Sequence, residues 1–416
     1  MRAFSINLSL RTSFLASCLV LTTATPNHAG GLERGGNSID LLFNPNRYAT
    51  QTTAGFVMPG RKLNNVQDNS PLNGPTGGGK RDRVRATEAY SAPQIGFKVG
   101  LTDSIDCMFG YSQPWGAHSN PGINWAGAND NIETLVNSHS YSGTCSYRLN
   151  VTEAASFRLI GGLSYQEFDG FQEKLVAPVP MNSFGWDGVG RLNLETSGWG
   201  QHFGISYEIP DYLFRTTLIY RSEIRLNDIT GTLDLTGLPP GSGGDPLAGG
   251  IWGIRGSARM PQYLEFQVQS GIAPNWLAFG SVKWADWSIL QEIPFYHGQR
   301  RVTSIDLLYQ DGWTVKVGIG HKFNDHLSGA IQTSWDRGTS TTIGSQTDTW
   351  ALSAGLSYAP SELVELKIGG LIGILTGGTS SGEAINPSTG RKYSDISYRF
   401  DDDIVTGLNA SLKLSF

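Results

Sequence analysis

The feature that most constrains the fold is a strict alternation of apolar and polar residues, repeated in segments along the whole chain. In the last segment, Leu408, Leu412 and Phe416 share one face, and Ser411 and Lys413 lie on the other. A period of two predicts half-buried β-strands. A soluble sandwich would pack the apolar face on a second sheet, whereas a membrane barrel would turn that face toward lipid.

The links between the segments decide between these two architectures. Six links are very short, such as Pro210-Asp211 and Asn324-Asp325, and seven are long and rich in Gly, Pro, Ser and Asp. Short and long links in strict alternation, with an even strand number, are typical of bacterial outer-membrane barrels. We therefore predict an all-β fold, a 14-stranded antiparallel transmembrane β-barrel, with strands at roughly 47–62, 89–101, 105–115, 138–149, 155–168, 196–209, 212–235, 255–273, 276–290, 312–323, 326–338, 347–359, 362–376 and 403–416.

Composition excludes several other classes of protein. Gly accounts for 53 of 416 residues, only 16% of residues are charged, and the formal net charge is -5. These values argue against a nucleic-acid-binding protein, a coiled coil and a long disordered chain. Beyond the N-terminus, no apolar run approaches the ~18 residues that a membrane-spanning helix needs.

Aromatic residues are placed as a barrel in a membrane requires, in two belts at the interfaces. The belt near the long loops would contain Trp115, Trp199, Trp313, Trp335 and Trp350. The belt near the short turns would contain Tyr147, Tyr207, Tyr212, Trp276 and Phe323.

The chain divides into three parts. Residues 1–29 have the charged, apolar and small-residue regions of a secretory signal peptide, the alternative being a buried first strand. Residues 30–46 precede the first strand, and their apolar run before Pro45 predicts a plug folded inside the barrel, with a disordered tail as the alternative. Residues 47–416 form the predicted transmembrane β-barrel.

Several short motifs carry a resemblance to a known family. Phe43-Asn44-Pro45 ahead of the first strand, the terminal Phe416, and the segments 260–264 and 284–288 resemble the FadL-type (OMPP1/FadL/TodX) family of outer-membrane transporters. The family's plug carries Asn-Pro-Ala, whereas this chain has Asn at the third position, Asn46. The resemblance implies a monomeric channel in the outer membrane of a Gram-negative bacterium. It implies passive uptake of hydrophobic compounds, with long-chain fatty acids as the first candidate, and no cofactor.

The resemblance also implies a kink in the third strand, through which the ligand leaves sideways into the bilayer. The matching segment, 110–114, contains Gly110 and Pro114. Since proline cannot donate to a sheet ladder, a local loss of pairing is expected there.

Candidate ligand-binding residues combine cations with apolar side chains, as an amphipathic carboxylate requires. Alternation turns Arg215, Ile219 and Arg221 inward, and continues with Glu223 and Arg225. The other candidates are Phe43 in the plug, Lys316, Leu371 and Leu375 on later strands, and Phe184 and Trp186 in the third long loop. The alternatives are a solvated lumen of paired charges and a loop that packs on itself as a lid.

Cys107 and Cys145 are predicted to face lipid on the neighbouring third and fourth strands. A disulfide is compatible with the oxidising periplasm, but we favour two small, unpaired residues that face lipid. The register is not fixed by sequence, so the Cα separation of the two residues stays open.

No hydrolase or metal-site motif stands out, so no enzyme activity is expected. Lipopolysaccharide is a candidate partner of the basic loop residues Lys80, Arg81, Arg83 and Arg85, which are otherwise simply solvated. A general hydrophilic porin is the alternative function, and an adhesin or structural barrel is a third. The segment 30–46 favours uptake of hydrophobic compounds, because a water-filled porin gains nothing from a plug.

Overall fold

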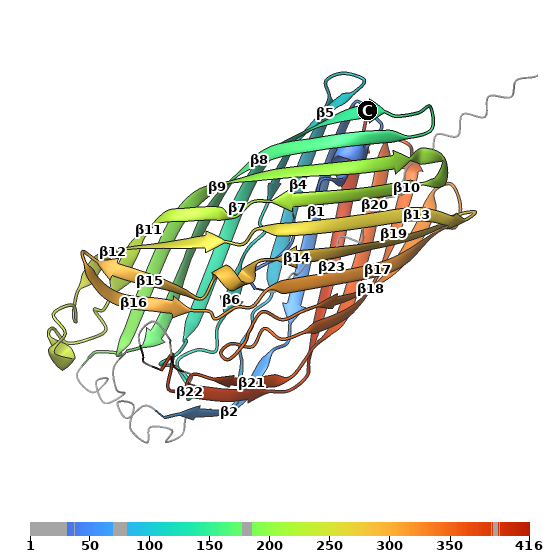
Figure 1. Cartoon of the computed structure of the whole chain (residues 1–416). Coiled ribbons are helices and arrows are strands. Elements are labelled where there is room, and N and C mark those ends of the chain that lie inside the picture. The colour runs from blue at the N-terminus through green and yellow to red at the C-terminus, as the bar shows by residue number, and fades with distance from the viewer. Residues whose placement is uncertain are drawn as a thin grey trace, which may run out of the picture.

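Pairing between neighbouring strands closes the wall of the molecule into a ring (Figure 1). The computed structural model describes residues 31–36, 38–69, 81–176, 185–383, 385, 390 and 392–416, so the expected signal peptide, Lys80 and Phe184 lie outside it. Going round the ring, the strands are β1 (Tyr48–Pro59), β4 (Tyr90–Gly100), β5 (Ile105–Ser112), β7 (Glu133–Asn150), β8 (Ser156–Leu175), β9 (Val189–Ile209), β10 (Phe214–Arg221), β13 (Tyr263–Ala273), β14 (Trp276–Ala285), β17 (Gly312–Lys322), β18 (Leu327–Asp336), β19 (Thr349–Ser361), β20 (Val364–Leu375) and β23 (Asp403–Ser415).

The ring closes because β1 pairs antiparallel with both β4 and β23. Thr50 of β1 lies opposite Phe97 on one side and Leu414 on the other. The prediction of a closed antiparallel barrel of 14 strands is therefore confirmed. The short turns gather at the end marked C in Figure 1, and the long loops lie at the opposite end.

Five strands of the ring are interrupted and continue as a second segment toward the long loops. These segments are β6 (Ala117–Ser119), β11 (Ile224–Asp234), β12 (Ile251–Met260), β15 (Glu292–His297) and β16 (Arg300–Asp306). Pro114 lies in the interruption between β5 and β6, and Pro261 lies between β12 and β13. A proline has no N–H to donate to the ladder, so each of these positions lacks one of the hydrogen bonds that would continue the strand.

The interruption between β10 and β11 corrects one prediction. It falls at Ser222 and Glu223, and the alternation beyond it is shifted by one residue. Ile224 and Leu226 are therefore buried, whereas the side chain of Arg225 is 70% exposed and faces outward.

The long loops contain further structure. A small sheet of β21 (Gly378–Ser381), β22 (Ile396–Phe400), β2 (Lys62–Asp68) and β3 (Val84–Arg85) lies at the loop end of the barrel (Figure 1). Short 3-10 turns are η1 (Asp40–Phe43), η3 (Pro210–Tyr212), η4 (Ser242–Gly244) and η5 (Trp287–Ile289). In the described part of the chain, no helix has the length and apolar character needed to cross a membrane.

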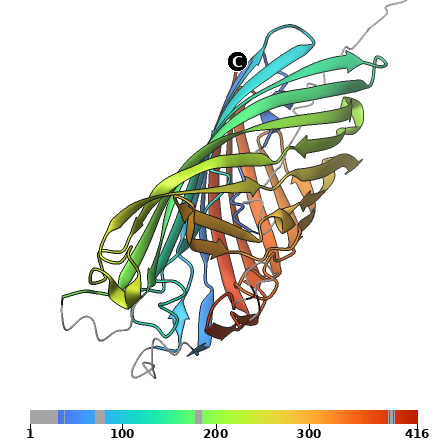
Figure 2. The same cartoon turned by 60° about the vertical axis from the view of Figure 1, so that its left-hand side comes forward.

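The outer face of the wall carries apolar side chains, with aromatic residues near both ends. Trp350 is more than half exposed at the long-loop end of β19, as predicted. Trp199 is also more than half exposed, but it lies at the middle of the long strand β9. The prediction for Trp115 is wrong, because this residue is 2% exposed and lies inside the barrel. Its ring meets Trp287 edge to face, and its Nε1–H donates to Gln166. Figure 2 shows the long strands β8 and β9, in green, running along the length of the barrel wall.

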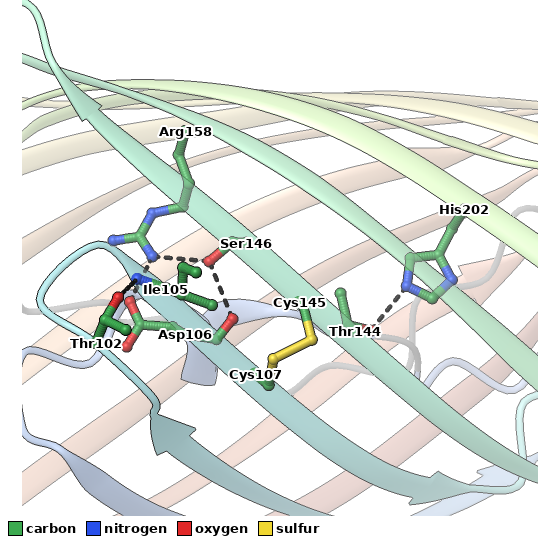
Figure 3. The surroundings of a disulfide bond; sticks show 9 residues. All are labelled: Thr102, Ile105, Asp106, Cys107, Thr144, Cys145, Ser146, Arg158 and His202. Carbon is green, nitrogen blue, oxygen red and sulfur yellow. Dashed lines mark hydrogen bonds and ion pairs between the residues drawn. A yellow bond between two sulfur atoms is a disulfide. The ribbon is translucent and has the colours of Figure 1, made fainter.

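The two cysteines of the barrel wall form a disulfide, which overturns the prediction of two unpaired residues. Cys107 of β5 lies directly opposite Cys145 of β7, with their Cα atoms 4.0 Å apart (Figure 3). Their outward orientation agrees with the prediction, since Phe109 and Tyr147 on the same face are exposed. The missing information was the register, which brings the two residues into one cross-strand pair.

Candidate functional site

The segment before β1 lies inside the ring of strands. Leu41, Leu42 and Phe43 of η1 are buried. They form an apolar cluster with inward residues of three wall strands, Met108, Ile160 and Ile219. Apolar burial of this kind holds the segment against the inside of the wall.

Charged side chains near the short-turn ends of β4 and β8 hold the same segment. Arg158 donates to the carbonyl oxygen of Leu42 and forms ion pairs with Asp106 and Glu208 at 2.9 and 3.1 Å. Lys98 forms an ion pair with Asp106 and donates to the carbonyl oxygens of Asn44 and Asn46. Buried charges are stable only when paired in this way.

The Asn-Pro-Asn stretch forms a turn at the foot of the segment. The side-chain oxygen of Asn44 accepts a hydrogen bond from the N–H of Asn46, as in an Asx-turn. The side-chain amide of Asn44 donates to Ser415 of β23 at 2.9 Å. Pro45 is exposed. The departure at Asn46 leaves the contact with Lys98 intact, because that contact uses the backbone carbonyl.

Two of the predicted ligand-binding residues, Arg215 of β10 and Phe43 of the segment itself, are in contact with each other. Arg215 forms an ion pair with Asp40 at 3.1 Å, and its guanidinium lies 4.1 Å from the centre of the Phe43 ring. Arg158 covers the same ring at 5.1 Å. Phe43 is thus enclosed by cations and protein atoms, and it lines none of the three cavities described next.

Three cavities follow one another through the lumen. The upper cavity, of about 210 Å³, lies near the long loops and includes Val57, Tyr90, Leu371, Leu375 and Val405 in its lining. The middle cavity, of about 140 Å³, is more polar and includes Arg215, Ile219, Arg221, Tyr263 and Glu265. The wall cavity, of about 50 Å³, touches the inner face of β4 and β5 at Gly96, Met108, Gly110 and Ser112.

Lys316 of β17 lines both the upper and the middle cavity. Within the described residues, no hydrogen bond or ion pair occupies its ammonium group. Its neighbour Lys283 differs, because it is buried in an ion pair with Glu33 of the N-terminal segment. Arg221 lines the middle and wall cavities and lies 5.8 Å from the centre of the Tyr263 ring. The structure thus brings six of the predicted residues onto the cavity surfaces, namely Arg215, Ile219, Arg221, Lys316, Leu371 and Leu375.

The interruption of the third strand opens a local gap in the ladder between β4 and β5. Pairing ends at Gln94 opposite Ser112, although β4 itself begins at Tyr90. Above the gap, the N–H of Glu88 donates to the carbonyl oxygen of His118. Gly110 remains inside the paired part of β5, whereas Pro114 lies in the interruption.

The N-terminal segment covers the inner side of this gap. The N–H of Arg34 donates to the carbonyl oxygen of Pro114, and the N–H of Gly116 donates to that of Leu32, both at 2.7 Å. The Arg34 guanidinium also lies 4.5 Å from the centre of the Tyr90 ring. The segment and the edge of the gap therefore share hydrogen bonds, which a movement of either one alone would break.

The chain was compared with known proteins and protein families. The family model described as "Outer membrane protein transport protein (OMPP1/FadL/TodX)" matches residues 42–369. The chain belongs to this family. The barrel of this FadL-type protein accordingly lies in the outer membrane, where its exposed apolar face meets lipid.

Individual relatives agree with this assignment. The FadL-type chain is 25% identical to the long-chain fatty acid transport protein of Salmonella typhi over 313 residues, which is 67% of this chain and 68% of the relative. Its fold is similar to the crystal structure of a Pseudomonas aeruginosa FadL homologue, with a TM-score of 0.74, 18% identity and coverage of 92% and 95% of the two chains. The toluene transporter TodX of P. putida gives a TM-score of 0.60 at 14% identity, with 94% and 99% coverage.

One part of the FadL-type site was missed by the sequence prediction. The inward faces of the upper wall form a large apolar cluster that includes Trp115, Leu226, Ile254, Trp287 and Phe295. The alternation of Ile224 and Leu226 is a usable signal, but the prediction continues the inward series of β10 through Glu223 and Arg225 and so places both residues on the outer face. Trp186 is partly exposed just ahead of β9 and lines none of the three cavities.

Proposed function

We propose that this FadL-type protein takes up long-chain fatty acids, or hydrophobic compounds with a similar anionic head group, passively through its lumen. The observation that carries the proposal is the ammonium group of Lys316, which has no partner among the described residues and lies beside the apolar lining of the upper cavity. The relatives from Salmonella typhi and Escherichia coli, both named long-chain fatty acid transport proteins, support the same substrate class.

The two ends of a fatty acid need different surroundings, and this cavity offers both. Leu371, Leu375, Val57 and Val405 can cover an alkyl chain, and each buried CH₂ group contributes about 0.8 kcal/mol. A carboxylate that leaves water needs a cation or hydrogen-bond donors, which Lys316 supplies. Arg221 lines the next cavity and can receive the head group after Lys316.

A hydrophilic porin is less well supported by the same lumen. Residues 38–46 fill its lower part with Leu41, Leu42 and Phe43, and the wall near the long loops turns an apolar cluster inward. Open aqueous channels belong to larger barrels of sixteen to eighteen strands, with polar interiors. We therefore assign residues 30–46 the role of a plug that closes the lumen.

Lateral release into the membrane is the exit route that we propose. The wall cavity reaches Gly110 and Ser112, directly below the gap between β4 and β5. A ligand that leaves through this gap keeps its alkyl chain out of periplasmic water. The chain acts as a monomer in this proposal, since its own 14 strands close the barrel. Exposed Arg81, Arg83 and Arg85 are the proposed loop contacts with lipopolysaccharide.

The test compares an acid with an alcohol of the same chain length. Lys316→Met should reduce uptake of a labelled C16 fatty acid roughly tenfold, the loss expected for one charge-assisted contact, and should leave uptake of the C16 alcohol much less affected. Lys322→Met is the matched control, because Lys322 lies at the periplasmic end of the same strand and pairs with Asp325. Equal losses for acid and alcohol would show that Lys316 has no role in binding the head group.

A further inference from the structure

Three arginines face outward on adjacent strands of the upper wall. Arg225 of β11 lies directly opposite Arg259 of β12, and their side chains are 70% and 55% exposed. Arg255 is also exposed, further along β12, and pairs with Thr230 of β11. We call Arg225, Arg255 and Arg259 the arginine patch. Figure 1 shows β11 and β12 side by side in the wall, between β9 and β15.

The strand register places the arginine patch at the outer membrane interface. Arg221 lies opposite His202 of β9, and Thr230 lies opposite Glu195. Between these two pairs, Arg225 falls beside the stretch of β9 that contains Trp199, whose side chain is 66% exposed. Exposed tryptophans mark the level of the lipid head groups. Trp199 lies ten residues from the periplasmic end of β9 at Ile209, which matches the roughly 9–11 residues that a strand needs to cross a membrane. The patch therefore lies at the head-group level of the outer leaflet.

The charges of the patch are only partly compensated by the protein. Like charges directly opposite on a sheet repel each other. Glu223 accepts from Arg225 at 2.7 Å and from Arg259 at 3.5 Å, so one carboxylate serves two guanidinium groups. Arg255 has no ion pair among the described residues, and Glu195, level with it, is separated from it by β11. Three cations thus face the lipid layer with one bound carboxylate.

We propose that the arginine patch binds the phosphate groups of lipopolysaccharide in the outer leaflet. Guanidinium groups match phosphate oxygens through paired N–H donors, and such bonds strengthen where water is scarce. The neighbouring upper wall offers aromatic and apolar side chains, Trp199 and Tyr220, to the acyl chains below the phosphates. This site is separate from the lumen and does not depend on the transported ligand.

The experiment measures lipopolysaccharide that stays bound to the purified full-length barrel. Wild type and the double variant Arg225→Gln/Arg259→Gln are incubated in detergent with rough lipopolysaccharide or its dephosphorylated form, washed, and analysed by mass spectrometry. We expect the double variant to retain roughly tenfold less of the phosphorylated form, as expected for lost charge-assisted bonds. Lys322→Gln, at the periplasmic rim, is the control and should retain the wild-type amount.

A second substitution moves the result in the opposite direction. Glu223→Gln removes the competing carboxylate and should increase retention, while Arg255→Gln alone should reduce it. These two single variants carry the test if the double variant does not give the heat-modifiable mobility of a folded barrel. The proposal is overturned if the arginine variants retain as much lipopolysaccharide as wild type, or if wild type binds the dephosphorylated form equally well. Fatty-acid uptake should be unchanged in all of them.

Discussion

The indole ring of Trp287 lies directly against Gly31. A Cβ atom at position 31 would come within 2.5 Å of this ring, and the backbone of Gly31 has a φ of +58°. Trp287 is fully buried, and it meets Trp115 and Tyr309 edge to face at 5.6 and 5.7 Å. The first described residue of the N-terminal segment is therefore fixed against a ring that has no room to move.

This contact predicts the effect of Gly31→Ala. The added methyl group should push the segment away from Trp287, with a loss of about 1–3 kcal/mol in the free energy of unfolding, as in overpacked cores. Gly122→Ala is the matched control, because Gly122 also has a positive φ of +78° but nothing within 4 Å of its Cβ position. Urea unfolding in detergent measures both variants. Equal losses would mean that only the backbone conformation matters.

A second prediction concerns the disulfide between β5 and β7. The double variant Cys107→Ser/Cys145→Ser opens a loop with a sequence separation of 38, for which chain entropy gives about 4 kcal/mol as an upper figure. We expect a lower urea midpoint for unfolding in detergent, and a similar shift when wild type is reduced. The bridge lies below the gap in the wall, so uptake by the folded variant should persist. An unchanged midpoint would show that the barrel wall alone fixes this pair of strands.

The sequence was sufficient to predict the ring of strands, because alternation and link length are local signals. The final strand shows this, with Leu408 and Leu412 outward and Ser411 inward. Interruptions of the strands were harder to see. One shift of a single residue at Ser222 and Glu223 reverses the faces of everything beyond it, which is why Arg225 was assigned to the lumen.

Contacts between segments that are distant in the sequence cannot be predicted from local patterns. Glu33 and Lys283 form a buried ion pair at a sequence separation of 250. The residues around either one contain no pattern that predicts the other as its partner. Register has the same limitation. Cys107 and Cys145 were assigned to neighbouring strands and to the same face, but only the register of β5 and β7 makes them partners. The place of Lys316 on the cavity surface was predictable from alternation, whereas the absence of a partner for it among the described residues was not.

A third prediction tests the proposed plug. Asp40→Asn with Arg215→Gln removes the ion pair between η1 and β10, which are joined at 3.1 Å. A buried pair holds a segment in place through both charges, so its removal should loosen residues 38–46 and raise the small-solute conductance in planar bilayers. Deletion of residues 31–44 should raise conductance further. Asp211→Asn in the short turn at η3 is the control. Wild-type conductance in both plug variants would contradict the role of this segment.

The last prediction concerns release through the wall. If the ladder of β4 and β5 continued beyond Gln94 and Ser112, Pro93 would lie opposite Gln113. In a background without the native cysteines, Pro93→Cys with Gln113→Cys should close the gap under oxidising conditions. Uptake of a labelled fatty acid should then fall, and it should recover on reduction. The control pair Ile95→Cys with Tyr111→Cys joins residues that are already partners in the ladder, so its crosslink should leave uptake unchanged. Uptake that is indifferent to the crosslink at 93 and 113 would refute lateral release, and would direct the ligand through the lumen past Leu42 and Phe43.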